Sequence, residues 1–240
     1  MRALLVIVLA AALASFAKVH AGDLVEDCNS DDPRVAVAGC SRLIAEVDLP
    51  ADKLSTALNN RGIAYAAGGV VELAIADFVV ASRVDAGNVM AFNNLCHIWL
   101  DVEQPRRALA ACNRAIDVNP NFYEAFSNRS LALQGLGDLE SALADASHAL
   151  DLNPSCPITR ANRGFLYERS GRPSEAIADY EAALRAMPDL ALAREGLARL
   201  RQGASLAPPA TARPRPVGQI EVARNGHLLH RGCAPSAGLH

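Results

Sequence analysis

The chain has 240 residues, with 23 basic and 26 acidic side chains and a formal charge of −3. Proteins that bind nucleic acid neutralise phosphates with clustered cations, and no basic block occurs here, so the charge argues against a nucleic-acid partner. Aromatic side chains make up 5% of the residues and alanine is abundant, which favours closely packed helices over a sheet core.

The N-terminus has the features of a secretory signal over residues 1–21. Arg2 gives a positive start, residues 3–14 are apolar, and Val19-His20-Ala21 forms a small-x-small cleavage site. The alternative is a membrane anchor, but the apolar run is short for crossing a bilayer. No later segment is apolar for long enough to cross one. We therefore expect an exported chain, periplasmic or secreted, with no membrane contact beyond the signal.

A helix is predicted within the next segment, residues 22–54. Asp32 supplies a carboxylate cap, and Pro33 suits the first helical position because its missing N–H is not needed there. The helix is expected to run to about Val47 and to end before Pro50. Its expected apolar face consists of Val35, Cys40, Leu43, Ile44 and Val47.

A period of 34 residues governs the chain from Ser55 to Pro188. Such a period is typical of supersecondary units that stack on their neighbours. Each unit is predicted to be two helices joined by a glycine or polar turn, with Pro120, Pro154 and Pro188 ending second helices. The recurring segments are Asn-Asn-Arg-Gly at 59–62, Asn-Asn-Leu-Cys at 93–96, Ser-Asn-Arg-Ser at 127–130 and Ala-Asn-Arg-Gly at 161–164.

These units resemble tetratricopeptide repeats. When each unit is counted from its first residue, small side chains recur at position 8 and alanine at positions 20 and 27, which lets the two helices approach closely. Two departures from the repeat pattern are Ala86, which replaces a proline in the first unit, and Arg160, near the start of the fourth. The alanines are Ala74, Ala108, Ala142 and Ala176 at position 20, and Ala81, Ala115, Ala149 and Ala183 at position 27.

The resemblance implies an all-α fold: a right-handed α-solenoid of four helix-turn-helix units with an N-terminal helix and a C-terminal capping helix. The helix over 189–202, with Leu190, Leu197 and Leu200 on one side, is expected to cover the last apolar face. Residues 203–240 are rich in proline, so we expect a disordered tail there. The four units are expected at residues 55–88, 89–122, 123–156 and 157–188.

Six cysteines in an exported chain indicate disulfides. In the resemblance, Cys96 and Cys112 occupy positions 8 and 24 of the second unit, which face each other across its helices, so we expect them to be bonded. A second bridge is expected between Cys28, in an extended segment, and Cys40 on the predicted helix. The state of Cys156 and Cys233 stays open. They either bond to each other, which would tie the tail across the repeats, or remain free thiols, or link to another chain.

A charge pattern marks the same second unit. The other three units carry Arg at position 7 and Asp at position 23, whereas the second has Leu95 and Ala111 there. Because Arg and Asp disappear together, we expect them to pair within a unit. An exposed pair contributes about 0.2–1 kcal/mol and a disulfide about 3 kcal/mol, so the exchange is favourable only in an oxidising compartment. The expected pairs are Arg61–Asp77, Arg129–Asp145 and Arg163–Asp179.

No motif in the sequence indicates catalysis or cofactor binding. Asp145 and His148 lie three residues apart on a predicted helix, and we interpret them as solvent-facing. His227, His230 and Cys233 form one ligand-like cluster, but structural zinc sites have four donors and a fourth is not evident. We therefore expect no metal, no cofactor and no enzymatic activity.

The resemblance places the candidate binding residues on the first helices, which line a concave groove in such repeats. Asparagine occupies position 6 of every unit, where its amide can pair with the backbone of an extended peptide or brace neighbouring helices. Position 9 is mostly apolar and either receives ligand side chains or packs between repeats. The candidates are Asn60, Asn94, Asn128 and Asn162 at position 6, and Ile63, His97, Leu131 and Phe165 at position 9.

The expected function is that of an exported scaffold which recognises a protein or peptide in this groove. The lysine-containing clamp for a C-terminal carboxylate, used by chaperone-binding relatives, is absent, because no lysine occupies position 5. Two alternatives stay open: self-association of the repeats through their end faces, which gives a homo-oligomer, and a regulatory subunit whose tail responds to a metal.

Overall fold

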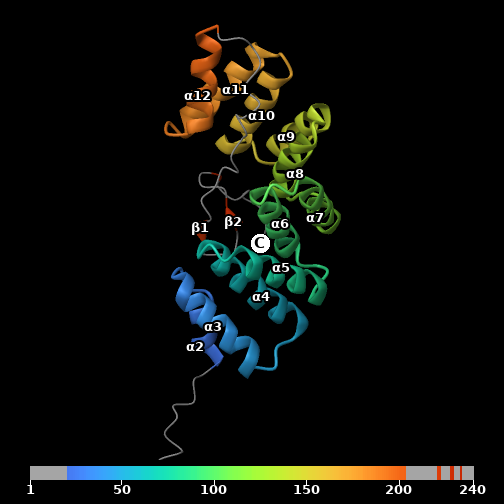
Figure 1. Ribbon diagram of the computed structural model, residues 1–240, viewed down its shortest axis with the longest axis vertical. Coiled ribbons are helices and arrows are strands. Elements are labelled where there is room, and N and C mark those ends of the chain that lie inside the picture. Colours follow the sequence, from blue (N-terminus) through green and yellow to red (C-terminus); the bar gives the residue numbers. More distant parts are fainter. Residues whose placement is uncertain (1–20, 204–220, 223–227, 230–232, 234–240) are drawn as a thin grey trace, which may run out of the picture.

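The computed structural model describes residues 21–203, 221–222, 228–229 and 233. The predicted signal, up to residue 20, and most of the predicted tail lie outside these residues. The described helices stack along the long axis of the molecule, which confirms the predicted all-α solenoid (Figure 1). The helices are α2 (Ala21–Cys28), α3 (Pro33–Glu46), α4 (Ala51–Ala67), α5 (Val71–Val84), α6 (Val89–Asp101), α7 (Pro105–Val118), α8 (Tyr123–Leu136), α9 (Leu139–Leu152), α10 (Pro157–Arg169), α11 (Pro173–Ala186) and α12 (Ala191–Arg201).

The described chain begins with a helical hairpin in which α2 packs on α3. Asp32 caps α3 as predicted: its carboxylate accepts a hydrogen bond from the backbone N–H of Arg34 at 2.9 Å. Gly39 lets the two helices touch, because a methyl group at this position would overlap Asp27 and the backbone of Cys28.

Two predictions for this hairpin were wrong. Cys28 does not lie in an extended segment but is the last residue of α2. This segment is helical because the helix buries Leu24 against α3. Val35 does not belong to the apolar face of α3 and is 40% exposed. The buried stripe of α3 runs instead through Ala36, Cys40 and Leu43, whose spacing of three to four residues puts them on one helical face.

Four helical hairpins follow, α4–α5, α6–α7, α8–α9 and α10–α11. The helices α7, α9 and α11 each end two residues before a proline, as predicted. The first hairpin starts at Ala51, earlier than the expected unit boundary at Ser55. Beyond the last hairpin, α12 packs against α10 and α11 with Leu190 and Leu197 buried. Within the described residues, no helix has both the length and the apolar character that crossing a membrane requires.

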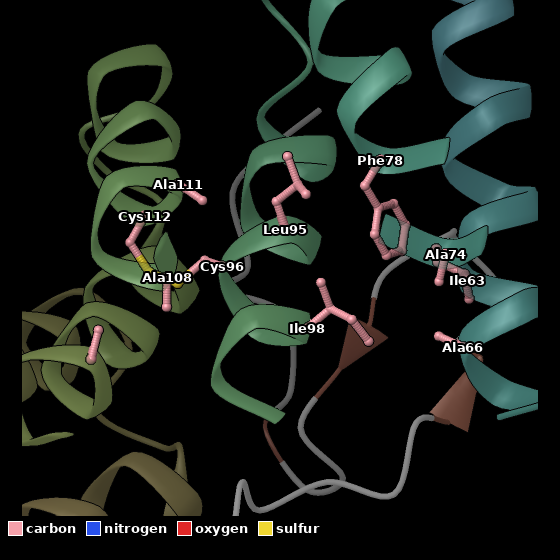
Figure 2. Close-up of a cluster of buried hydrophobic side chains, with 11 residues drawn as sticks. Ile63, Ala66, Ala74, Phe78, Leu95, Cys96, Ile98, Ala108, Ala111 and Cys112 are labelled. Carbon is pink, nitrogen blue, oxygen red and sulfur yellow. A yellow bond between two sulfur atoms is a disulfide. The ribbon is translucent and has the colours of Figure 1, made fainter. Parts of the chain in front are cut away.

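Contact between the two helices of a hairpin depends on positions 8 and 24. Where position 8 is glycine, position 24 is aromatic, and its ring fills the space that a side chain at position 8 would need. A methyl group on Gly62, for example, would lie 2.7 Å from the ring of Phe78. The second unit instead joins the helices by a disulfide (Figure 2). Side-chain volume is thus balanced within each unit, and the four pairs are Gly62–Phe78, Cys96–Cys112, Ser130–Ala146 and Gly164–Tyr180.

The Tyr180 ring gives a test of this close packing. Gly196 of α12 also touches it, and a methyl group there would overlap the ring, which is fully buried and held by a 2.8 Å hydrogen bond to Glu168. We expect Gly196→Ala to lower the free energy of unfolding by about 1–3 kcal/mol in urea denaturation. Gly22→Ala is the control, because Gly22 has open space around it, and equal effects of the two substitutions would contradict this packing.

The predicted Arg–Asp pairs within units are confirmed. Arg61 binds Asp77 with two hydrogen bonds of 2.8 Å, and these bonds raise the pKa of the arginine. Arg129–Asp145 and Arg163–Asp179 repeat this arrangement at 2.6–2.9 Å. Each arginine also donates to the preceding helix, to Ser41, Asn113 and Ser147 respectively, so the pair joins successive units.

The pairs are less exposed than the sequence analysis assumed. The Asp77 side chain is only 9% exposed, and Asp145, which we expected to face solvent beside His148, is buried. Burial follows from the geometry, since each aspartate lies on a second helix and turns inward to the arginine of the first. A buried carboxylate depends on its cation much more strongly than an exposed one does.

This dependence predicts an asymmetry between single and double substitutions. Arg61→Leu leaves Asp77 buried without its partner and should cost about 3–5 kcal/mol of unfolding free energy. Adding Asp77→Ala reproduces the Leu–Ala combination of the second unit and should recover much of that loss. Urea denaturation followed by circular dichroism measures both. A double variant no more stable than Arg61→Leu would show that the pair does not act as a unit.

Candidate functional site

The first helices α4, α6, α8 and α10 carry all eight residues that the sequence analysis proposes for binding. We call their side chains at positions 2, 5, 6, 9 and 12 the first-helix surface. Of the eight residues, Asn60 is partly exposed and the other seven are buried. Their burial means that side chains of this surface already have neighbours in the folded chain.

The asparagines connect neighbouring first helices. The Nδ2 atom of Asn94 donates to Oδ1 of Asn59 at 2.8 Å, and Nδ2 of Asn128 donates to Oδ1 of Asn93 at 3.0 Å. Each bond joins position 6 of one unit to position 5 of the unit before it. These two amide nitrogens therefore brace neighbouring first helices, which is one of the two roles that the sequence left open. Position 5 was missed as their partner, although the Asn-Asn dipeptides at 59–60 and 93–94 carried that signal.

The series of asparagine bonds stops at the fourth unit. Position 5 of the third unit is Ser127, whose hydroxyl lies 2.9 Å from that of Thr159 and not against Asn162. Asn162 is fully buried, and among the residues that the structure describes neither Oδ1 nor Nδ2 of its amide has a hydrogen-bond partner. Such a group costs about 1–3 kcal/mol unless something binds it.

Two further buried oxygen atoms of amide side chains are without a hydrogen-bond partner among the described residues. Within the described chain, Oδ1 of Asn94 and Oε1 of Gln134 have no hydrogen-bond donor. Gln134 occupies position 12 on α8 and was not among the residues predicted from the sequence. Together with Asn162, they give α6, α8 and α10 one amide side chain each that has at least one unsatisfied atom. The arrangement can donate to and accept from the main chain of an extended peptide.

The apolar candidates at position 9 take part in packing. Ile63 lies in one hydrophobic cluster with Phe78 and Ile98, and Phe165 lies in another with Tyr180. His97 places Nδ1 at 3.2 Å from the carboxylate of Asp101, one turn later on α6. Packing between repeats, the second role left open by the sequence, therefore describes Ile63, whereas Phe165 packs within the fourth unit and the capping region.

Two buried carboxylates belong to the same surface. Glu168, at position 12 of the fourth unit, accepts two hydrogen bonds from Arg199 of α12, at 3.0 and 3.1 Å, and one from Tyr180. Glu124, at position 2 of the third unit, lies beside Tyr123, and burial raises its pKa to about 7. The capping helix thus secures one carboxylate, while the other changes charge near neutral pH.

Glu124 predicts a measurable pH dependence of stability. Between pH 4.5 and about 7 the folded chain holds this proton and the unfolded chain releases it, so unfolding free energy falls as pH rises through that window. Glu124→Gln should remove this fall and stabilise the protein by up to about 3 kcal/mol at pH 8. Urea titrations at several pH values test it, with exposed Glu140→Gln as the control. Parallel pH profiles for wild type and Glu124→Gln would contradict the assignment.

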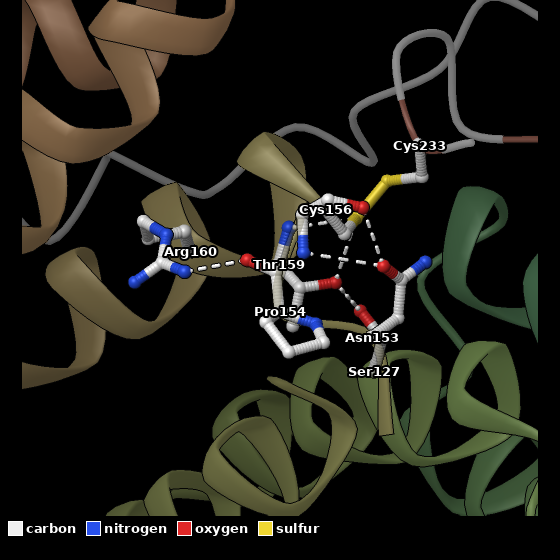
Figure 3. Close-up of a disulfide and its surroundings, with 8 residues drawn as sticks. Ser127, Asn153, Pro154, Cys156, Thr159, Arg160 and Cys233 are labelled. Carbon is white, nitrogen blue, oxygen red and sulfur yellow. Dashed lines mark hydrogen bonds between the residues drawn. A yellow bond between two sulfur atoms is a disulfide. The ribbon is translucent and has the colours of Figure 1, made fainter. Parts of the chain in front are cut away.

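All six cysteines are bonded in the structure. The bridges Cys28–Cys40 and Cys96–Cys112 are those that the sequence analysis expects. Cys156 and Cys233, whose state it left open, bond to each other (Figure 3). This bond rules out the proposed role of Cys233 as a metal ligand, since a disulfide sulfur is not a thiolate. His227 and His230 lie outside the described residues, within which no metal-binding group of three side chains occurs.

The comparisons with known proteins identify the repeats. Two tetratricopeptide repeat family models match the sequence, at residues 123–156 and 159–190. The chain therefore contains tetratricopeptide repeats. A search of curated proteins found no match to the sequence.

Solved structures of tetratricopeptide repeat proteins share the fold. YrrB, described as having an unusual peptide-binding site, is 24% identical with a TM-score of 0.57, covering 72% of this chain and 86% of its own. A thermophilic repeat protein of Thermus thermophilus is 22% identical with a TM-score of 0.58 over 71% and 91%. MamA of Desulfovibrio magneticus is 19% identical with a TM-score of 0.60 over 71% and 95%.

Proposed function

We propose that this tetratricopeptide repeat protein is an exported, non-catalytic scaffold that binds an extended segment of a protein or peptide along its first-helix surface. The observation that carries the proposal is the set of unsatisfied buried amide atoms on α6, α8 and α10, and above all Asn162. A buried amide without a partner lowers stability, and a bound main chain that supplies the missing hydrogen bonds would recover that loss on binding. The peptide-binding site described for YrrB supports this choice of ligand.

Export is supported by the oxidised state of the cysteines. Three disulfides in one small domain are characteristic of the periplasm or the extracellular space, because cytosolic thiols are kept reduced. The apolar N-terminal segment with its cleavage signature supplies the route out of the cytosol.

The two alternative functions have less support. The outer side of the capping helix carries charged residues such as Arg194, Glu195 and Arg201, which suits solvent better than end-to-end stacking. A metal-responsive tail has lost one of its three proposed ligands to the Cys156–Cys233 bond. Neither alternative uses the unsatisfied amides of the first helices.

Asn162 allows a test that separates binding from folding. Because its amide makes no hydrogen bond to the described residues, Asn162→Ala should change the unfolding free energy by less than about 1 kcal/mol or stabilise the fold. The affinity for a partner co-purified from the exported fraction should fall about tenfold, which corresponds to about 1.4 kcal/mol for one lost interaction. Titration calorimetry of the purified pair measures the loss.

Asn121→Ala is the matched control, since this asparagine lies exposed in the loop before α8. It should leave affinity and stability unchanged. Unchanged partner affinity in Asn162→Ala would contradict the proposed surface.

A further inference from the structure

Described residues of the C-terminal segment, residues 204–240, lie at the first unit of the solenoid. Residues Glu221–Val222 form strand β1, which pairs antiparallel with β2, Leu228–Leu229, in the register Glu221–Leu229 and Val222–Leu228. Strand β1 lies against α4. In Figure 2 one strand lies beside the part of α4 that carries Ile63 and Ala66, which are positions 9 and 12 of the first-helix surface.

The same segment is fixed by Cys233 at the junction of the third and fourth units. Its partner Cys156 is the N-cap residue of α10 (Figure 3). Cys233 is buried in a cluster with Tyr123, Phe126 and Ile158. Tyr123 and Ile158 lie at the starts of the first helices α8 and α10. Described residues of the segment therefore lie against first helices at two separate places, at α4 and where α8 and α10 begin.

The third disulfide differs in kind from the other two. Cys28–Cys40 and Cys96–Cys112 join residues 12 and 16 apart, each within one helical hairpin, whereas Cys156 and Cys233 are 77 residues apart. Its loop encloses the whole fourth unit and α12. Such a bond does not align two helices of a hairpin. It keeps a distant segment at one place on the repeats.

The charges of the two parts are complementary. Residues 204–240 contain four arginines and one acidic residue, Glu221, while the whole chain has a net charge of −3. Residues 51–203, which form the repeats and α12, contain 18 acidic and 15 basic side chains, and the carboxylate of Asp101 lies on the first helix α6. Opposite charge on a segment and on the surface that it contacts favours their association.

We propose that the C-terminal segment is an intramolecular occupant of the first-helix surface, held there by the Cys156–Cys233 disulfide. This inference rests on the proposed function, because it makes the segment a competitor of the external partner. A ligand tethered through a short link acts at an effective concentration of about millimolar, so a partner must bind more strongly than the segment does. Loss of the disulfide leaves only the longer backbone link from α12, which lowers that effective concentration. Both sulfurs are buried, which makes the bond a lasting tether of the folded chain.

A labelled peptide of residues 217–233, with Ser in place of Cys233, tests the competition. The protein variants are the oxidised full chain and the full-length Cys156→Ser, Cys233→Ser double variant. Serine at position 156 keeps an N-cap acceptor for α10, so that helix should be retained. Fluorescence anisotropy should show the peptide binding the double variant at least about ten times more tightly than wild type. Equal affinity for both proteins, or binding to neither, would overturn the proposal.

The control is a Cys28→Ser, Cys40→Ser variant, which loses a disulfide but keeps the tether and should bind the peptide as weakly as wild type. Hydrogen exchange of the oxidised wild type needs no variant: amides of residues 221–222 and 228–229 should be protected, and uniformly rapid exchange there would also overturn the proposal. These results are independent of the partner titration with Asn162→Ala. Peptide competition without an effect of Asn162 on the partner would refute the proposed function alone.

Discussion

Close contact between the two helices of each hairpin is the constraint on which this solenoid depends. Alanines at positions 20 and 27 are fully buried in all four units, and positions 8 and 24 adjust their volumes to each other. The space between the two helices is filled in three ways: by glycine beside an aromatic ring, by two bonded cysteines, and by serine beside alanine. The Arg–Asp pairs secure three of these hairpins, and the arginines also reach the preceding helix, so contact within a unit and contact between units are coupled.

The second unit shows what replaces that coupling. Leu95 and Ala111 stand where the other units carry the charged pair, and both are buried. The Cys96–Cys112 bond beside them joins the two helices covalently. This exchange gives up a buried ion pair, whose net contribution is small because desolvation opposes it, for a bond whose benefit lies in restricting the unfolded chain.

The sequence predicted most of the fold because its features are periodic. Helix ends followed from prolines, and the Arg–Asp pairing followed from their joint loss in one unit. Exposure and inter-unit bonding were harder to predict. The bond from Asn94 to Asn59 depends on how far successive units rotate, and the burial of Asp145 depends on the arginine opposite it. Neither is encoded in a local pattern. The helix ending at Cys28 was missed because only its contact with α3 stabilises so short a segment.

The candidate site combines two features that the sequence hinted at separately. The row of asparagines was visible, but the structure divides it into bracing amides and one unsatisfied amide, Asn162. The open pairing of Cys156 and Cys233 becomes a tether that brings the C-terminal segment to the first helices. These two features are the basis of our proposals that the first-helix surface holds an extended chain, the protein's own and then a partner's.

Nuclear Overhauser effects in the oxidised full chain test this account most directly. It predicts cross-peaks between the backbone amides of Glu221 and Val222 and methyl groups of α4. Random-coil shifts for residues 221–222 and 228–229, with no cross-peak to any first helix, would contradict it.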